Sequence, residues 1–308
     1  MEDVGRSALF LHVKCSGLHK RHRGLAGEKV HQLGDSEELK TRARNAVMKI
    51  EILTDDNPLY VLPFFEEFLK NYSSEFEIAH ISVCRPMGDR SRVQLLRELS
   101  ALYGAGGIAR IAGQLLSARL LGVLPLRANA KRFFTLSQLC AAYRIPFERI
   151  TNPNAESIVR EVRERKPDLL VSVACPYILK RTLLSIPPFG GINIHHAPLP
   201  KYRGMMPTFW QMFHEEKRVG VTIHYMVEKI DRGQALLRDE FPIEPGESLD
   251  HLIRRSKRHG AHCMARVLRQ IVTRTQVAVP LSETEGSYFT FPSLQQIREF
   301  RQRGLRAL

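Results

Sequence analysis

The 308-residue chain has no closely spaced cysteine pairs, no long apolar run and no excess of acidic residues. Its five cysteines are widely and irregularly spaced, which argues against a disulfide framework or a zinc knuckle. No apolar run reaches the roughly 18 residues that a membrane span needs, and the N-terminus has no secretory pattern. These absences predict a cytoplasmic protein with reduced thiols and no metal site.

Acidic residues are scarce beside basic ones. The chain has 32 Asp and Glu against 46 Lys and Arg, so its net charge is +14 at pH 7. This balance favours anionic partners such as nucleotides, phosphates, nucleic acid or a membrane surface, without choosing among them. The hydrophobic content of 44% is ordinary, and the length is enough for one large domain or two modest ones.

The organisation of the chain changes at Met48. Residues 1–47 are basic, rich in histidine and poorly periodic, which predicts a disordered extension. Translation could start at Met1 or at Met48, and the sequence leaves both open. Residues 48–275 are expected to form the main domain, with an insertion at about 90–132. Residues 276–308 are expected to be a C-terminal tail with a short helix.

Strand and helix patterns alternate through the main domain. Helices alternating with strands predict an α/β fold, with a mostly parallel twisted sheet flanked by helices. In such folds the active site lies beyond the carboxyl ends of the strands. The expected strands are 49–54, 76–83, 145–150, 168–173, 191–195, 219–226 and 234–241. The expected helices are one carrying Phe64 to Leu69 (capped by 55–58), then 136–143, 155–165, 177–184, 208–213 and 249 to about 273.

The insertion at 90–132 is strongly basic. It holds eight Lys or Arg against one acid, Glu98, and Ile108, Ile111, Leu115 and Leu116 have helical spacing. One interpretation is a pair of helices that pack on the sheet and expose a solvated basic face. The other is a platform for an anionic or lipid-linked substrate, or for a membrane surface, which would make it a peripheral membrane contact.

The densest polar cluster in the chain is residues 193–204. Asn193 and His195 are two apart on a predicted strand, so their side chains point to the same side. The amide can donate a hydrogen bond to a developing oxyanion, and the imidazole can donate or shuttle a proton. The plainer alternative is a polar strand end with a structural histidine and a proline-rich turn.

A second cluster covers residues 220–234, where a predicted strand runs into a tight turn that presents Asp231. A carboxylate beside a histidine can orient the imidazole, stabilise its charged form and accept a proton from an amine. An aspartate that stands alone near a glycine is more often an ordinary turn residue.

Together the two clusters resemble the N10-formyltetrahydrofolate-dependent formyltransferases. The shared pattern is Asn-x-His, then Leu-Pro-x-Tyr-Arg-Gly, then Gly-Val-Thr-x-His, then Asp-x-Gly. Here it occupies residues 193–195, 199–204, 220–224 and 231–233 in that order. The resemblance covers about residues 48–245. It implies a Rossmann-like formyltransferase fold with a helical insertion, and 10-formyltetrahydrofolate as the formyl donor.

The resemblance also implies residue roles. Asn193 and His195 would stabilise the tetrahedral oxyanion, while Asp231 would tune His195 and relay the proton. An apolar slot for the pterin would be formed by Tyr177, Ile178, Leu179, Met226, Val227, Glu228 and Ile230. The acceptor would be bound by Tyr202, Arg203, Gly204 and His224.

The acceptor and the reaction class have alternatives. Ala197 replaces a serine common in the family, and His196 before it resembles formyltetrahydrofolate deformylases, which hydrolyse the same donor. The loop at 201–204 favours transfer. Only 31 residues follow Val277, too few for the C-terminal barrel of methionyl-tRNA formyltransferases, so nucleic acid is not the expected partner. The expected acceptor is a small phosphorylated amine, such as a nucleotide-linked or lipid-linked amino sugar. A non-catalytic binding protein on this fold is a further alternative.

Overall fold

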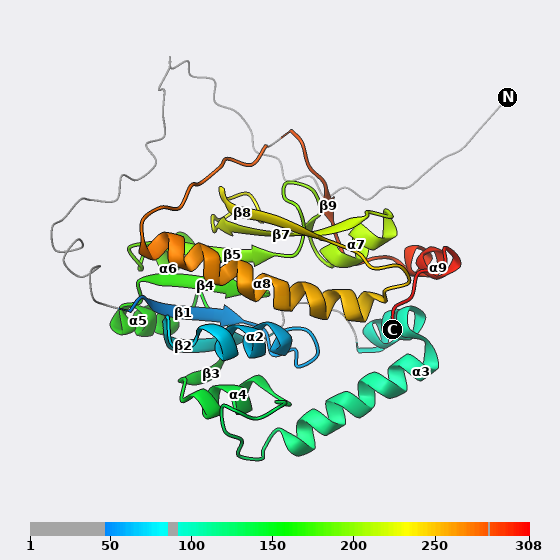
Figure 1. Cartoon of the computed structure of the whole chain (residues 1–308), viewed down its shortest axis with the longest axis horizontal. Coiled ribbons are helices and arrows are strands. Elements are labelled where there is room, and N and C mark those ends of the chain that lie inside the picture. The colour runs from blue at the N-terminus through cyan, green and yellow to red at the C-terminus, as the bar shows by residue number, and fades with distance from the viewer. Residues whose placement is uncertain (1–46, 86–91, 283) are drawn as a thin grey trace, which may run out of the picture.

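The computed structural model describes residues 47–85, 92–282 and 284–308 (Figure 1). The expected disordered extension, apart from Val47, and the basic residue Arg90 lie outside this range. A seven-stranded sheet runs through the centre of the domain, in the order β3-β2-β1-β4-β5-β7-β8. Its strands are β1 (Lys49–Thr54), β2 (Glu77–Cys84), β3 (Phe147–Ile150), β4 (Leu169–Val173), β5 (Gly191–His195), β7 (Arg218–Tyr225) and β8 (Ala235–Pro242).

The sheet is parallel from β3 to β5 and antiparallel beyond β5. The α/β fold with a mostly parallel sheet is therefore confirmed. The reversal matters for the site, because β7 runs back along β5 and pairs Asn193 with His224 and His195 with Thr222.

Helices cover both faces of the sheet. On one face lie α2 (Leu62–Tyr72) and α8 (Leu249–Val272), side by side (Figure 1). The other face packs against α5 (Glu156–Arg165) and the short α6 (Arg181–Leu184). Alternate strand residues serve the two faces: Ile52 joins the core under α2 and α8, and Leu53 joins the core under α5 and α6. A strand buried on both faces explains the nearly continuous apolar runs in the sequence.

Some element boundaries differ from the prediction. The N-cap of α2 is Val61 and has no side-chain cap, so residues 55–58 do not cap the helix, and the turn before it spans residues 58–61. The helix expected at 177–184 is present only as α6, because the residues before it are tied to Asn154: Asn154 Oδ1 accepts from Lys180 N and Asn154 Nδ2 donates to Ile178 O. Helix α4 spans Leu136–Tyr143, as predicted.

The basic insertion forms α3 (Arg92–Leu121), which is broken at Gly104, where φ is 68°. The predicted pair of helices is therefore confirmed, but its predicted packing on the sheet is wrong. The main packing partner of α3 is α9 (Leu294–Gln302), and the second half of α3 extends along the edge of the molecule (Figure 1). No helix in the described residues is both long and apolar enough to cross a membrane.

An aromatic cluster attaches the C-terminal segment to the domain. Phe209 on α7 (Pro207–Phe213) stacks on Phe300 of α9 with ring centroids 4.9 Å apart. Trp210 stacks on Phe289 at 4.6 Å. Phe289 belongs to the two-residue strand β9 (Tyr288–Phe289), which pairs with β6 (Arg203–Gly204) beside the polar cluster of the sequence. The short helix predicted within 276–308 is α9, and it helps to hold the site together.

Replacing Phe300 with Ala should destabilise the fold strongly. The side chain is fully buried, so the change removes a stacked ring and leaves a cavity. We expect the free energy of unfolding, measured by urea titration, to fall by about 3–5 kcal/mol. Leu124→Ala, at a side chain that is 48% exposed, is the control and should change it by less than about 0.5 kcal/mol. A similar small loss for Phe300→Ala would contradict the packing described here.

Candidate active site

Four polar side chains meet at the carboxyl end of β5. Asn193 and His195 point to one side of β5, and His224 lies opposite Asn193 on β7. After β7 the chain turns back and presents Asp231, whose backbone is in the left-handed region with φ of 51°. The carboxylate lies between the two histidines, 3.6 Å from His195 Nδ1 and 3.6 Å from His224 Nε2.

His224 orients the amide of Asn193. His224 Nδ1 lies 2.9 Å from the carbonyl oxygen of Tyr225, which can only accept, so Nδ1 carries the proton. Nε2 is then the acceptor for Asn193 Nδ2 at 3.1 Å. This fixes which end of the amide faces His224. It also leaves the second N–H of Asn193 available to a ligand, since no described group accepts from it.

His195 is held at both ring nitrogens. Nε2 lies 2.8 Å from the carbonyl oxygen of Tyr202, to which it donates, and Nδ1 faces Asp231. Burial lowers the pKa of His195, although the charge of Asp231 and the Tyr202 carbonyl act in the opposite direction. The imidazole is therefore neutral at neutral pH, with an unprotonated Nδ1 beside a carboxylate.

Asp231 stays ionised in this buried place. Burial alone would raise its pKa, but attraction to His195 and His224 in their protonated forms, together with the N–H of Gly204, outweighs burial and lowers the pKa to about 2. The Gly204 N–H donates to Asp231 Oδ2 at 3.0 Å. Gly204 has φ of +92°, and a Cβ there would lie 2.3 Å from the carbonyl oxygen of Phe289, so only glycine fits this approach.

Two residues predicted to contact substrate turn their side chains inward. The ring of Tyr202 is buried, stacks on Phe289 and donates its hydroxyl to Glu216 at 2.7 Å. His224 is only 2% exposed. The backbone carbonyl of Tyr202 accepts a hydrogen bond from His195 and so orients the imidazole. His224 accepts a hydrogen bond from Asn193 and so orients the amide.

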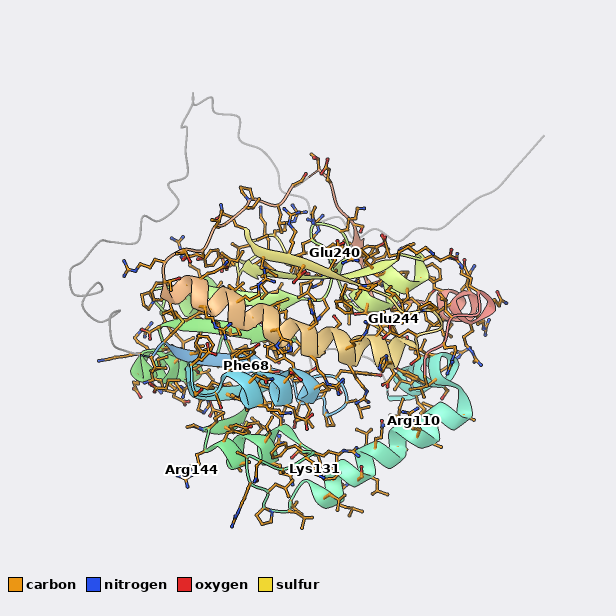
Figure 2. The ribbon with its side chains drawn as sticks, viewed as in Figure 1. Phe68, Arg110, Lys131, Arg144, Glu240 and Glu244 are labelled. Atoms are coloured by element: carbon orange, nitrogen blue, oxygen red, sulfur yellow. The ribbon has the colours of Figure 1, made fainter. Side chains whose placement is uncertain are left out.

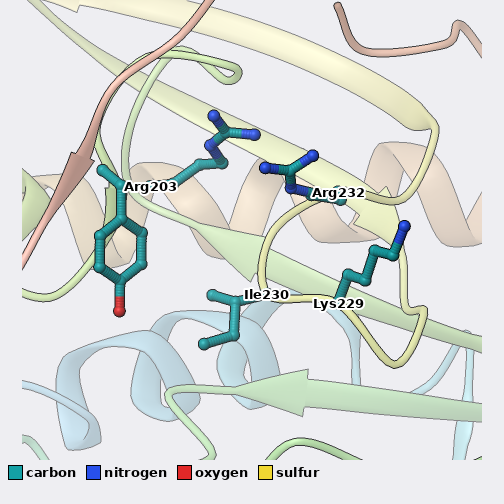
Figure 3. A pocket seen from close by; sticks show the side chains of 5 residues that line it. Arg203, Lys229, Ile230 and Arg232 are labelled. Carbon is teal, nitrogen blue, oxygen red and sulfur yellow. The ribbon is translucent and has the colours of Figure 1, made fainter. Parts of the chain in front are cut away.

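A hollow of about 550 Å³ lies beside Asp231 and is strongly cationic (Figure 3). Of the predicted substrate residues only Arg203 lines it through its side chain. Lys229 and Arg232 extend toward it from the turn that carries Asp231, and Tyr288 comes from β9. Sequence reasoning missed Lys229, Arg232 and Tyr288. Lys229 and Arg232 lie within two positions of Asp231 in the sequence, which could have identified them as site residues. Nothing in the sequence around Tyr288 indicated that it would lie at the site.

The residues predicted for a pterin slot come from two loops that touch. Glu228 accepts a hydrogen bond from the backbone N–H of Arg181 at 3.0 Å, which links the loop after β7 to the one after β4. Ile178, Val227 and Ile230 are 47%, 45% and 43% exposed, so three apolar side chains are open to a ligand. The others are less open: Leu179 is buried, Met226 packs on the core, and the Tyr177 hydroxyl donates to the carbonyl of Thr151.

One group of possible metal ligands lies away from this site. Within the described residues, Asp239, His259 and Cys263 bring ligand atoms within 4.8 Å of one another. Arg266 Nη1 lies 3.0 Å from the same Asp239 carboxylate and already neutralises it. At the site itself, two histidines and one carboxylate, with an amide beside them, are suited to proton transfer and to stabilising a developing oxyanion.

Replacing Asp231 with Asn should lower the pKa of His195 further below its ordinary value of 6.5, because the negative charge that opposes burial is lost. Titration of the histidine ring signals by NMR measures this. Asp239→Asn is the matched control, since it should lower the pKa of His259 and leave His195 unchanged. A His195 pKa that stays the same or rises in Asp231→Asn would contradict the described geometry.

Comparison with known proteins agrees with this site. Residues 128–268 match the family model described as formyl transferase. The chain is 36% identical over 147 residues to the methionyl-tRNA formyltransferase of Syntrophus aciditrophicus (strain SB), which covers 48% of this chain and 47% of that protein. The chain thus spans about half the length of that curated relative.

Solved structures share the fold at low sequence identity. Phosphoribosylglycinamide formyltransferase from Anaplasma phagocytophilum aligns with a TM-score of 0.51 at 15% identity, over 79% of this chain and 98% of that one. Glycinamide ribonucleotide transformylase 1 from Symbiobacterium toebii aligns with a TM-score of 0.50 at 14% identity, over 77% and 95%. The matched residues 128–268 include Asn193, His195 and Asp231, so the similarity to formyl transferases covers the segment that carries the site.

Proposed function

We propose that this protein transfers a formyl group from 10-formyltetrahydrofolate to a primary amine. The observation that carries the proposal is the meeting of Asn193, His195 and Asp231 at one strand end, inside a formyl transferase domain. A hydrogen bond holds each of these side chains in place. The Asn193 amide donates to His224, the His195 imidazole donates to the Tyr202 carbonyl, and the Asp231 carboxylate accepts from the Gly204 N–H. Such preorganisation is what acyl transfer requires.

The chemistry follows from the protonation states. When the amine nitrogen bonds to the formyl carbon, the formyl oxygen gains negative charge, and the free N–H of Asn193 can donate to it. The amine must lose a proton, and the unprotonated Nδ1 of His195 can accept it, directly or through water. Asp231 stabilises the resulting imidazolium at 3.6 Å. When the bond from the carbon to the donor nitrogen breaks, that nitrogen takes the electron pair and the proton that His195 accepted from the amine.

The donor would lie against the two linked loops. Ile178, Val227 and Ile230 offer exposed apolar side chains beside backbone groups, and a flat pterin suits a slot of that kind. The residues predicted for the pterin slot thus remain our proposal for donor binding. Leu179 is buried and would support the slot from the core without contacting the pterin.

The acceptor would carry phosphate. Arg203, Lys229 and Arg232 place three cations around the hollow next to Asp231, and phosphate is the anionic group that such a cluster recognises. We therefore propose a nucleotide-linked or lipid-linked amino sugar as the acceptor. Methionyl-tRNA is the second candidate, supported by the named relative and the net charge of +14.

A direct assay separates the candidates. The protein is incubated with 10-formyltetrahydrofolate, and tetrahydrofolate release is followed with no acceptor, with phosphorylated amino sugars and with methionyl-tRNA. The proposal expects release that depends on a phosphorylated amine. Release without acceptor would indicate a hydrolase, release only with methionyl-tRNA would indicate the second candidate, and no release with any acceptor would favour a non-catalytic binding protein.

Asn193→Ala should reduce kcat by about a hundredfold or more, because one oxyanion donor of this kind contributes that much. Asn71→Ala is the matched control, since Asn71 is exposed on α2 and bonds only to Glu67. Full turnover in Asn193→Ala, with the control also active, would rule out the proposed mechanism.

The double variant Lys229→Ala/Arg232→Ala should raise KM for a phosphorylated acceptor by about tenfold with little change in kcat, since both cations line the hollow without touching the catalytic groups. KM for 10-formyltetrahydrofolate should stay the same. Lys70→Ala/Arg160→Ala removes the same two residue types from exposed positions on α2 and α5 and serves as control. If KM for the acceptor stays the same in the double variant, the acceptor does not bind in the hollow lined by Lys229 and Arg232.

A further inference from the structure

The second half of α3 and the turn after it expose an apolar surface. Of the fifteen large apolar side chains that are exposed in the described residues, six fall within ten positions of the chain. Their exposed fractions are 45% for Leu115, 56% for Leu116, 61% for Leu120, 38% for Leu121, 81% for Val123 and 48% for Leu124. We call these six residues the α3 apolar surface.

This arrangement is the reverse of an ordinary surface helix, which buries its apolar stripe and exposes polar residues. From residue 105 to residue 121 the buried positions are the small residues Gly107 and Ala118. The exposed positions include alanines and the leucines of the α3 apolar surface, with Arg110 and Arg119 as the only charged residues. Clustered exposed leucines of this kind mark an interaction site.

The stretch of chain that contains the α3 apolar surface carries one sign of charge. No Asp or Glu occurs from residue 99 to residue 147, while that span holds six cations: Arg110, Arg119, Arg127, Lys131, Arg132 and Arg144. None of the six forms an ion pair within the described chain. In Figure 2, Arg110, Lys131 and Arg144 are labelled in the lower half of the view, and the acids Glu240 and Glu244 are labelled above them.

We propose that the α3 apolar surface docks on an anionic lipid bilayer. The leucines would enter the boundary between headgroups and acyl chains, and the arginines would contact lipid phosphates. This inference goes beyond the proposed function and does not rest on it, because none of these residues belongs to the formyl-transfer site.

Two other occupants fit the surface less well. In a symmetric contact with a second copy, the same surface faces itself, so the cations would lie against cations. A single-stranded nucleic acid is bound by basic residues interleaved with exposed aromatic rings, but the α3 apolar surface has none, and of the nearby rings Phe133 is buried while Phe134 and Tyr143 are half-buried. Leucines beside arginines, in a stretch of chain that contains no acid, match the apolar and the charged parts of an anionic bilayer.

Co-sedimentation of the full chain with vesicles tests the proposal. The vesicles contain phosphatidylcholine alone, or phosphatidylcholine with phosphatidylglycerol in equal parts. We expect binding to the anionic vesicles that weakens with added salt and falls by about tenfold or more in Leu116→Gln/Leu120→Gln. Val277→Gln/Val279→Gln is the matched control, because those two valines are 70% and 45% exposed far from α3 and should leave binding unchanged.

Thermal unfolding of each variant shows whether it is folded, and such exposed positions should be tolerated. The proposal is overturned if the wild type does not bind anionic vesicles. It is equally overturned if the leucine variant binds them as well as the wild type, which would mean that charge alone is responsible. A dimer in solution that the leucine variant dissociates, together with no vesicle binding, would assign the surface to a second copy.

Discussion

The buried carboxylate of Asp231 is the constraint on which the site depends. Burial would raise its pKa, but attraction to the protonated forms of the two histidines and the hydrogen bond from the Gly204 N–H together lower the pKa to about 2. Each partner imposes a requirement on the fold. His224 requires β7 to run antiparallel to β5, and the Gly204 approach requires the β6–β9 pairing and a residue without a side chain. The turn must also hold Asp231 in the left-handed region. The local geometry of three distant segments is thus set by one charge.

The same turn also divides the two proposed ligands. Met226 and Val227 give the donor side its apolar character, Lys229 and Arg232 line the cationic hollow beside Asp231, and Ile230 lines that hollow as well. A formyl carbon between these two sides would lie near the Asn193 amide and the His195 imidazole. The division explains why one short segment carries so many predicted site residues, and why its substitutions should separate acceptor binding from donor binding. The α3 apolar surface stands apart from this centre and would place the protein at a bilayer without changing the chemistry proposed for the site.

The sequence was informative where a short-range pattern decides the structure. Alternating strands and helices predicted the parallel part of the sheet, and the spacing of Asn193 and His195 placed both side chains on one side of a strand. The order of the motifs pointed to Asp231. What the sequence could not predict depends on contacts between distant residues. Tyr202 turns inward because Phe289, 87 positions later, supplies its stacking partner. Lys229 and Arg232 face a hollow whose far wall is Tyr288, and α3 leaves the sheet because α9 holds it; neither relation has a local signature.

The most direct test follows the carbon itself. 10-Formyltetrahydrofolate labelled with ¹³C in the formyl group is mixed with the protein and a phosphorylated amino sugar, and the label is observed by NMR. The account predicts that the ¹³C signal moves into a formamide on the amino sugar, and that it remains on the folate when Asn193→Ala replaces the wild type. A label that appears as free formate at the same rate with and without the amine would contradict transfer as the reaction of this site.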